Sequence, residues 1–168
     1  MRQAGLLLAL VAVACSPAQP NASAPRPVRG AAVEFAFGAL DGSVVTHETT
    51  QGRVTALLFV TSFDLPSQVA ARQLAEVQRV HRPRFNAAAV ALESAENATL
   101  VAVFRDTLAL PYPVTIADRV ELQSSPAFAQ IDRVPTLVLL DRQGLVSVQH
   151  YGAFERKNLE AWLHEAER

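Results

Sequence analysis

The chain has 168 residues, of which 15 are Lys or Arg and 16 are Asp or Glu, so its formal net charge is −1. This length predicts a single folded domain. No basic excess is available to neutralise phosphates, so nucleic acid is not an expected partner. The single cysteine excludes an internal disulfide, a Cys-x-x-Cys redox pair and a zinc site made of several thiolates.

A signal peptide is predicted for residues 1–14. Arg2 precedes an apolar run from Ala4 to Ala14, and this order is typical of exported chains. The run has about 11 residues, whereas a membrane-spanning helix needs about 20, so a permanent span is not expected. Ala12-Val13-Ala14-Cys15 resembles the bacterial lipobox, with Ala12 in place of the usual leucine. This resemblance implies a lipid anchor on Cys15, and plain cleavage after a small residue is the alternative.

Residues 15–32 are expected to link that anchor to the folded domain, which spans 33–168. They are rich in Pro, Ala and Ser and show no apolar period, which is typical of a flexible tether. We therefore expect a lipid-anchored domain in the periplasm of a bacterial cell envelope. Ser16 stands where an aspartate often retains lipoproteins at the inner membrane, which favours the outer membrane.

Strands and helices alternate along the first half of the domain. Asp41-Gly42 favours a tight turn and predicts a hairpin. Continuous apolar runs predict two further strands that are buried on both faces. The four predicted strands are 33–37, 43–45, 54–61 and 85–92. A helical apolar period predicts a helix over 66–81, with Ala70, Leu74, Val77 and either Val80 or His81 on its inner face.

The second half of the domain continues the alternation and ends in a hairpin and a helix. A helix over 95–108 is expected to turn Leu100, Val103, Phe104 and Leu108 inward. Ser125-Pro126 resembles a helix start and predicts a short helix over 125–131. The remaining predicted elements are strands at 112–116, 136–140 and 145–151 and a helix at 155–167. This order predicts an α/β sandwich around a mixed sheet.

Three passages resemble the TlpA-like branch of the thioredoxin superfamily, which is related to the redoxins and AhpC/TSA proteins. Phe35 to Val45 resembles the family's F-x-x-x-D-G segment, and Leu58 to Ser67 resembles the segment that carries its redox cysteines. Val134-Pro135-Thr136 resembles the element whose proline is cis and faces those cysteines. The resemblance implies a thioredoxin-like three-layer sandwich, in which a central mixed sheet has helices on both faces and an N-terminal hairpin.

The sequence departs from this family at the two redox positions. Asp64 and Ser67 stand there, with Leu65 and Pro66 between them. Thiol exchange needs an attacking thiolate and a second thiol to resolve the mixed disulfide, so the family's reductase activity is not expected here. Asp64 is instead expected to cap the helix that follows it. Ser67 has no triad or elbow motif that would make it a nucleophile.

No cofactor or metal is expected. The four histidines, His47, His81, His150 and His164, lack metal-ligand spacing. Copper-binding and peroxide-reducing relatives of the family use cysteines that this chain does not have.

A binding site is the function that the sequence favours. The candidate site consists of Phe63, Asp64, Leu65, Pro66, Ser67, Val134 and Pro135. Phe63 stands where the family has a tryptophan, and its apolar neighbours predict a surface that binds a peptide or a partner protein of the envelope. Packing of Phe63 beneath its own loop is the other interpretation. The alternative function is an envelope thiol-disulfide oxidoreductase or antioxidant that works with the thiols of a partner.

Overall fold

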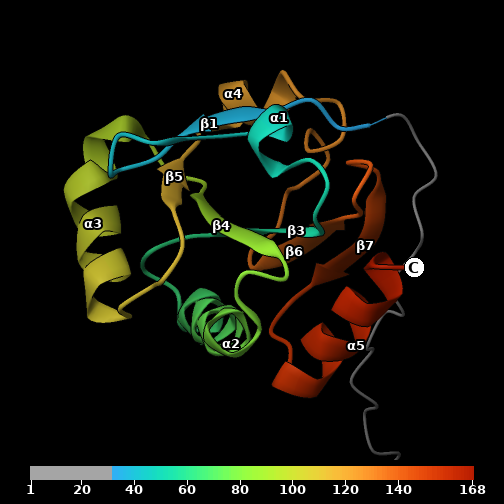
Figure 1. Cartoon of the computed structure of the whole chain (residues 1–168). Helices are drawn as coiled ribbons and strands as arrows, with labels where there is room; N and C mark the ends of the chain where they lie inside the picture. Colours follow the sequence, from blue (N-terminus) through green and yellow to red (C-terminus); the bar gives the residue numbers. More distant parts are fainter. Residues whose placement is uncertain (1–31) are drawn as a thin grey trace, which may run out of the picture.

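The computed structural model describes residues 32–168 (Figure 1). The predicted signal peptide, the lipidation of Cys15 and all of the tether except Ala32 lie outside the described residues. Within residues 32–168, no helix combines the length and apolar character that crossing a membrane requires.

A mixed five-stranded sheet forms the centre of the domain, in the order β5-β4-β3-β6-β7. Strands β3, β4 and β5 run parallel, and β6 and β7 run antiparallel to their neighbours. A separate antiparallel pair, β1 and β2, forms the predicted hairpin. The strands are β1 (Ala36–Gly38), β2 (Val44–Thr46), β3 (Thr55–Val60), β4 (Asn86–Ala91), β5 (Val114–Ile116), β6 (Thr136–Leu140) and β7 (Val146–Tyr151).

Helices cover both faces of this sheet, as the sequence predicts (Figure 1). The helices are α1 (His47–Thr50), α2 (Leu65–His81), α3 (Ala98–Thr107), α4 (Arg119–Gln123) and α5 (Arg156–Ala166), and a 3-10 turn, η1 (Ala95–Asn97), precedes α3. One core cluster joins α2, α3 and α5 to the sheet. The other lies beneath the hairpin and α4, where the rings of Phe35, Phe37, Phe59 and Phe128 pack together.

The central strand β3 is buried along its whole length. Alternate residues reach opposite cores: Leu58 joins the α2 side, and Leu57 and Phe59 join the hairpin side. This explains why its sequence is a continuous apolar run and does not alternate. Because β3 is central and fully packed, the residues that follow it start from a rigid position.

Two expectations about local structure are wrong, and a third is resolved between its two alternatives. Residues 125–131 form turns and not a helix, since the Ser125 hydroxyl donates to the carbonyl of Glu34 and does not cap a helix. Leu100 and Val103 do not face inward: their side chains are 58% and 56% exposed, and Val101 is buried instead. Of the two alternatives for the last inner position of α2, Val80 is exposed, and His81 is half-buried and contacts Glu160.

Candidate functional site

Asp64 lies where β3 ends and α2 begins, and it caps the helix as expected. Its Oδ1 accepts a hydrogen bond from the backbone N–H of Ser67 at 2.7 Å. Its Oδ2 accepts a second from the Ser67 hydroxyl, also at 2.7 Å, and a third from the Thr61 hydroxyl. Ser67 Oγ in turn accepts from the backbone N–H of Thr61 at 3.2 Å. Asp64 and Ser67, which stand where the family that the sequence resembles has its redox cysteines, are therefore hydrogen-bonded to each other.

This cluster has little capacity for chemistry. Ser67 is completely buried, so its hydroxyl cannot reach a substrate. Its proton is directed at the Asp64 carboxylate, and none of the hydrogen bonds of this group involves a histidine. A serine nucleophile needs an accessible hydroxyl oxygen and an adjacent general base that accepts its proton. The arrangement is that of a helix cap that fixes a loop.

Glu93 is a site residue that the sequence analysis missed. It is buried, and its carboxylate accepts from the backbone N–H of Ser62 at 2.6 Å and from Asn97 Nδ2 at 3.2 Å. It thus joins the end of β4 to the loop that presents Phe63. An acidic residue placed two positions after β4 is the signal that could have identified it, because the carboxyl ends of adjacent parallel strands meet at one edge.

Two large apolar side chains of the candidate site are mostly exposed to solvent. Phe63 is 76% exposed and Leu65 is 70% exposed. Phe63 does not pack beneath its loop, so that interpretation is wrong. It lines a depression of about 290 Å³ together with residues of α2 and α3. We call this the Phe63 depression; its lining residues are Ser62, Phe63, Gln68, Leu100, Val103, Phe104, Thr107 and Leu108.

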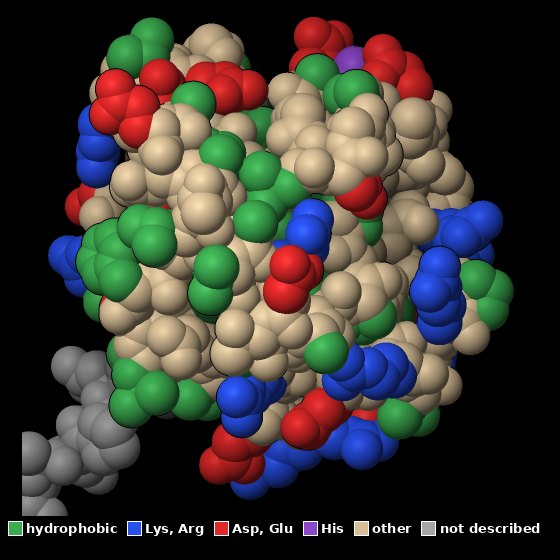
Figure 2. All heavy atoms as spheres, turned by 90° about the vertical axis from the view of Figure 1, so that its left-hand side faces the viewer, with side chains coloured by type: hydrophobic (Ala, Val, Ile, Leu, Met, Phe, Trp, Pro, Cys, Tyr) green, Lys and Arg blue, Asp and Glu red, His purple; other side chains and the backbone are tan. Residues whose placement is uncertain are grey.

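Figure 2 shows the face of the molecule on which α3 lies, where hydrophobic side chains are exposed among charged ones. The exposed large apolar side chains of α3, Leu100 and Val103, are two of the four that the sequence analysis turned inward. They extend the apolar surface beyond the loop at Phe63 and onto a second element.

Pro135 has the cis bond that the resemblance implies. It directly precedes β6, whose first residue, Thr136, pairs with Phe59 near the end of β3. Val134 and Pro135 are therefore at the same edge of the sheet as Asp64. Pro135 is buried and Val134 is half-buried, so the apolar surface beside Phe63 is supplied by α3 and not by this proline.

The histidines lie apart from the site. His81 contacts Glu160, and the ring of His150 lies 4.6 Å from that of Trp162. Among residues 32–168, no group of three or more histidines, cysteines or acidic residues is placed to hold a metal ion.

Neither a family model nor a curated protein matches the sequence. Solved structures do match the fold. A thiol:disulfide interchange protein of the thioredoxin family from Chlorobium tepidum is 21% identical with a TM-score of 0.67, and the match covers 86% of this chain and 97% of that one. A DsbF homologue from Corynebacterium diphtheriae is 14% identical with a TM-score of 0.74, over 87% and 95% of the two chains.

A third match is a secreted disulfide oxidoreductase from Mycobacterium tuberculosis, homologous to E. coli DsbE. It is 16% identical with a TM-score of 0.66, and the match covers 78% of this chain and 95% of that one. These identities show the fold alone. The chain therefore has the thioredoxin-like α/β fold, with an aspartate and a serine at the ends of its Asp64-Leu65-Pro66-Ser67 segment.

Proposed function

We propose that this protein is a redox-inactive thioredoxin-like domain that binds an extended apolar segment of a peptide or partner protein. The observation that carries the proposal is the contrast between two pairs of residues. Asp64 and Ser67 are hydrogen-bonded to each other, whereas Phe63 and Leu65 beside them are exposed. The loop thus presents apolar surface and has no reactive group.

The absence of cysteine from residues 33–168 supports redox inactivity. The chain contains one cysteine, Cys15, which precedes the domain. A carboxylate and a hydroxyl neither attack a disulfide nor resolve a mixed one. A domain that binds without catalysing exchange needs only the surface that surrounds the former redox positions.

The apolar side chains supply the binding energy in this proposal. Full burial of a Phe or Leu side chain contributes about 1.5–3 kcal/mol relative to leaving it exposed. Phe63, Leu100 and Val103 line one depression, so a single apolar side chain of the partner can contact all three. Such a small surface fits an extended segment better than a large rigid interface.

The location is part of the proposal. We infer that Cys15 carries a lipid and that residues 15–32 hold the domain away from the membrane on its periplasmic side. The signal-like N-terminus supports this, as does the fold similarity to a protein described as secreted. Labelling of the full chain with radioactive palmitate in a bacterial host tests the anchor, since Cys15→Ser should abolish the label.

Binding is tested with a defined unfolded protein, reduced and carboxymethylated α-lactalbumin, which has no free thiols. The parent chain should bind it, and Phe63→Ala should weaken binding by about tenfold, as expected from the loss of one buried aromatic side chain. Val120→Ala is the matched control, because Val120 is 75% exposed on α4 and does not line the Phe63 depression. Equal weakening by both variants, or none by Phe63→Ala, would contradict the proposed surface.

The second candidate function is thiol-disulfide exchange with the help of a partner's thiols. The fold similarity to a thiol:disulfide interchange protein favours it. Reduction of insulin by dithiothreitol distinguishes the two functions. We expect the purified full chain to give no rate above the uncatalysed reaction, and a rate that depends on chain concentration would support the second candidate.

A further inference from the structure

A second pocket lies at the other edge of the sheet from Asp64. It has a volume of about 320 Å³, within the range of about 300–1,000 Å³ that is common for ligand sites. Asn86 and Ala87, at the start of β4, line it, whereas Asp64 follows the end of the neighbouring β3. The six-residue strands separate these edges by roughly 20 Å. This pocket is therefore independent of the proposed partner surface.

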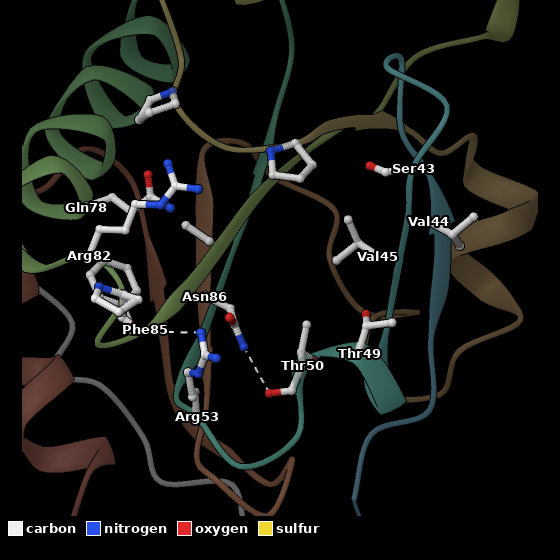
Figure 3. A pocket seen from close by; sticks show the side chains of 14 residues that line it. Ser43, Val44, Val45, Thr49, Thr50, Arg53, Gln78, Arg82, Phe85 and Asn86 are labelled. Carbon is white, nitrogen blue, oxygen red and sulfur yellow. Dashed lines mark hydrogen bonds between the residues drawn. The ribbon is translucent and has the colours of Figure 1, made fainter.

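The pocket exists because β5 is short. β5 pairs with β4 only from Ala89 onward, and Pro111 and Pro113, which precede β5, line the pocket. Proline has no N–H to donate to a neighbouring strand. The first residues of β4 therefore face a space between the end of α2 and the hairpin, as Figure 3 shows.

Two arginines and no carboxylate line this space. Arg53 precedes β3, and its Nη1 donates to the carbonyl of Pro83 at 3.4 Å. Arg82 directly follows α2 as its C-cap residue. Within residues 32–168, neither arginine forms an ion pair with an acidic side chain. The C-terminal end of α2 opposes an anion with only about half an elementary charge, which is less than the two guanidinium charges.

Gln78 also lines this pocket, and its side chain carries a buried hydrogen-bond acceptor. Its side chain is 6% exposed, and its Oε1 has no hydrogen-bond partner among the described residues. Buried polar atoms are nearly always paired, so an unpaired one needs a ligand or a water. In Figure 3 the side chains of Gln78 and Arg82 lie on one side of the pocket, and Val45 and Thr49 lie on the other.

We propose that this pocket binds a small organic carboxylate that also carries an N–H donor and an apolar group. Arg53 and Arg82 bind the carboxylate, and Gln78 Oε1 accepts from the N–H. The apolar walls contact the rest of the molecule; they are Val45, Phe85, Pro111 and Pro113.

Hippurate is the probe, because it combines a carboxylate, an amide N–H and an aromatic ring. It is titrated into the isotopically labelled full chain in detergent micelles, and binding is measured by NMR. We expect shifts at Arg53, Gln78 and Asn86. N-benzoylsarcosine, which lacks the N–H, and hippurate methyl ester, which lacks the charge, should each bind about tenfold more weakly. No shift at these residues would overturn the proposal.

Substitutions test the contribution of the two arginine charges separately from that of the Gln78 acceptor. Arg53→Gln and Arg82→Gln should each weaken hippurate binding at least fivefold, a factor of about the size that a lost charge-assisted hydrogen bond produces. Arg72→Gln, on the exposed side of α2 outside the pocket, should leave it unchanged. Equal binding by the parent and both pocket variants, or equal affinity for inorganic phosphate, would overturn the proposal.

Gln78→Met keeps the side-chain length and removes the acceptor. Because the parent leaves Oε1 unpaired, this variant should melt no lower than the parent. It should also bind hippurate and N-benzoylsarcosine equally. A variant that melts lower and retains the parent's preference for hippurate would contradict the role of Gln78.

Discussion

Asp64 shows how one side chain can fix the shape of a loop through hydrogen bonds alone. It accepts three hydrogen bonds, from Ser67 N–H and from the hydroxyls of Ser67 and Thr61. We predict that Asp64→Ala lowers the free energy of unfolding by about 2–3 kcal/mol, which is more than an ordinary helix cap contributes. Urea unfolding measures this difference.

Asp118 provides the matched control for that measurement. It caps α4 through one hydrogen bond, to the backbone N–H of Glu121 at 2.8 Å. Asp118→Ala should cost about 1 kcal/mol. If the two variants lose the same stability, the hydroxyl bonds of Asp64 contribute nothing.

The buried Tyr112 leads to a prediction about how stability depends on pH. Its ring is buried, and its hydroxyl donates to the carbonyl of Ala71 at 2.8 Å. Burial raises the pKa of the Tyr112 phenol well above its usual value of 10.0, and the charge of Arg79 only partly opposes this. The folded state therefore holds its proton where the unfolded state releases it, so stability falls as the pH rises above about 10.

The measurement is the ultraviolet absorbance of phenolate in the folded protein. The chain has two tyrosines, Tyr112 and Tyr151, and we expect Tyr112→Phe to leave the titration up to about pH 11 unchanged. The same substitution should cost about 1 kcal/mol through its lost hydrogen bond. A titration that Tyr112→Phe reduces by half while the protein remains folded would show that the phenol is accessible.

At the scale of elements, the helical period of α3 does not determine which of its apolar residues are buried. Leu100, Val101, Val103 and Phe104 are all apolar, so the helical period permits more than one inner face. We predict that Val101→Ala, in the core, costs about 2 kcal/mol in urea unfolding. Leu100→Ala should change stability by less than about 0.5 kcal/mol. A large loss in Leu100→Ala would mean that the core also contains that residue.

The long elements were predictable from sequence because burial imposes a pattern on them. β3, β4 and α2 have continuous apolar runs or a clear helical period. The short helices α1 and α4 were not predicted. α1 starts with a capping box made by Thr46 and Thr49, with a threonine in place of the usual Glu or Gln. α4 has a readable signal, since Asp118 caps it and Glu121 follows three residues later.

At the scale of the whole molecule, the architecture was easier to predict than the site. Alternation of strands and helices limits the possible folds strongly. The site depends on contacts between distant residues, such as the bond from Ser62 N–H to Glu93. The exposure of Phe63 and the lack of a partner for Gln78 Oε1 also depend on which distant residues lie nearby. Residue type and spacing do not determine these contacts.

The last prediction concerns the whole fold: two introduced cysteines should give the domain thiol-disulfide exchange activity. In a Cys15→Ser background, Asp64→Cys with Ser67→Cys places two thiols where the parent side chains already meet, with Ser67 Oγ 2.7 Å from Asp64. The first lies at the start of α2, where the helix dipole lowers a thiol pKa. We expect this variant to accelerate insulin reduction by dithiothreitol at least tenfold over the parent, because a thiol of lowered pKa supplies more of the attacking thiolate. Asp64→Cys alone, with no resolving thiol, should give a much smaller rate. A folded double variant without activity would mean that this fold does not provide the geometry that exchange needs.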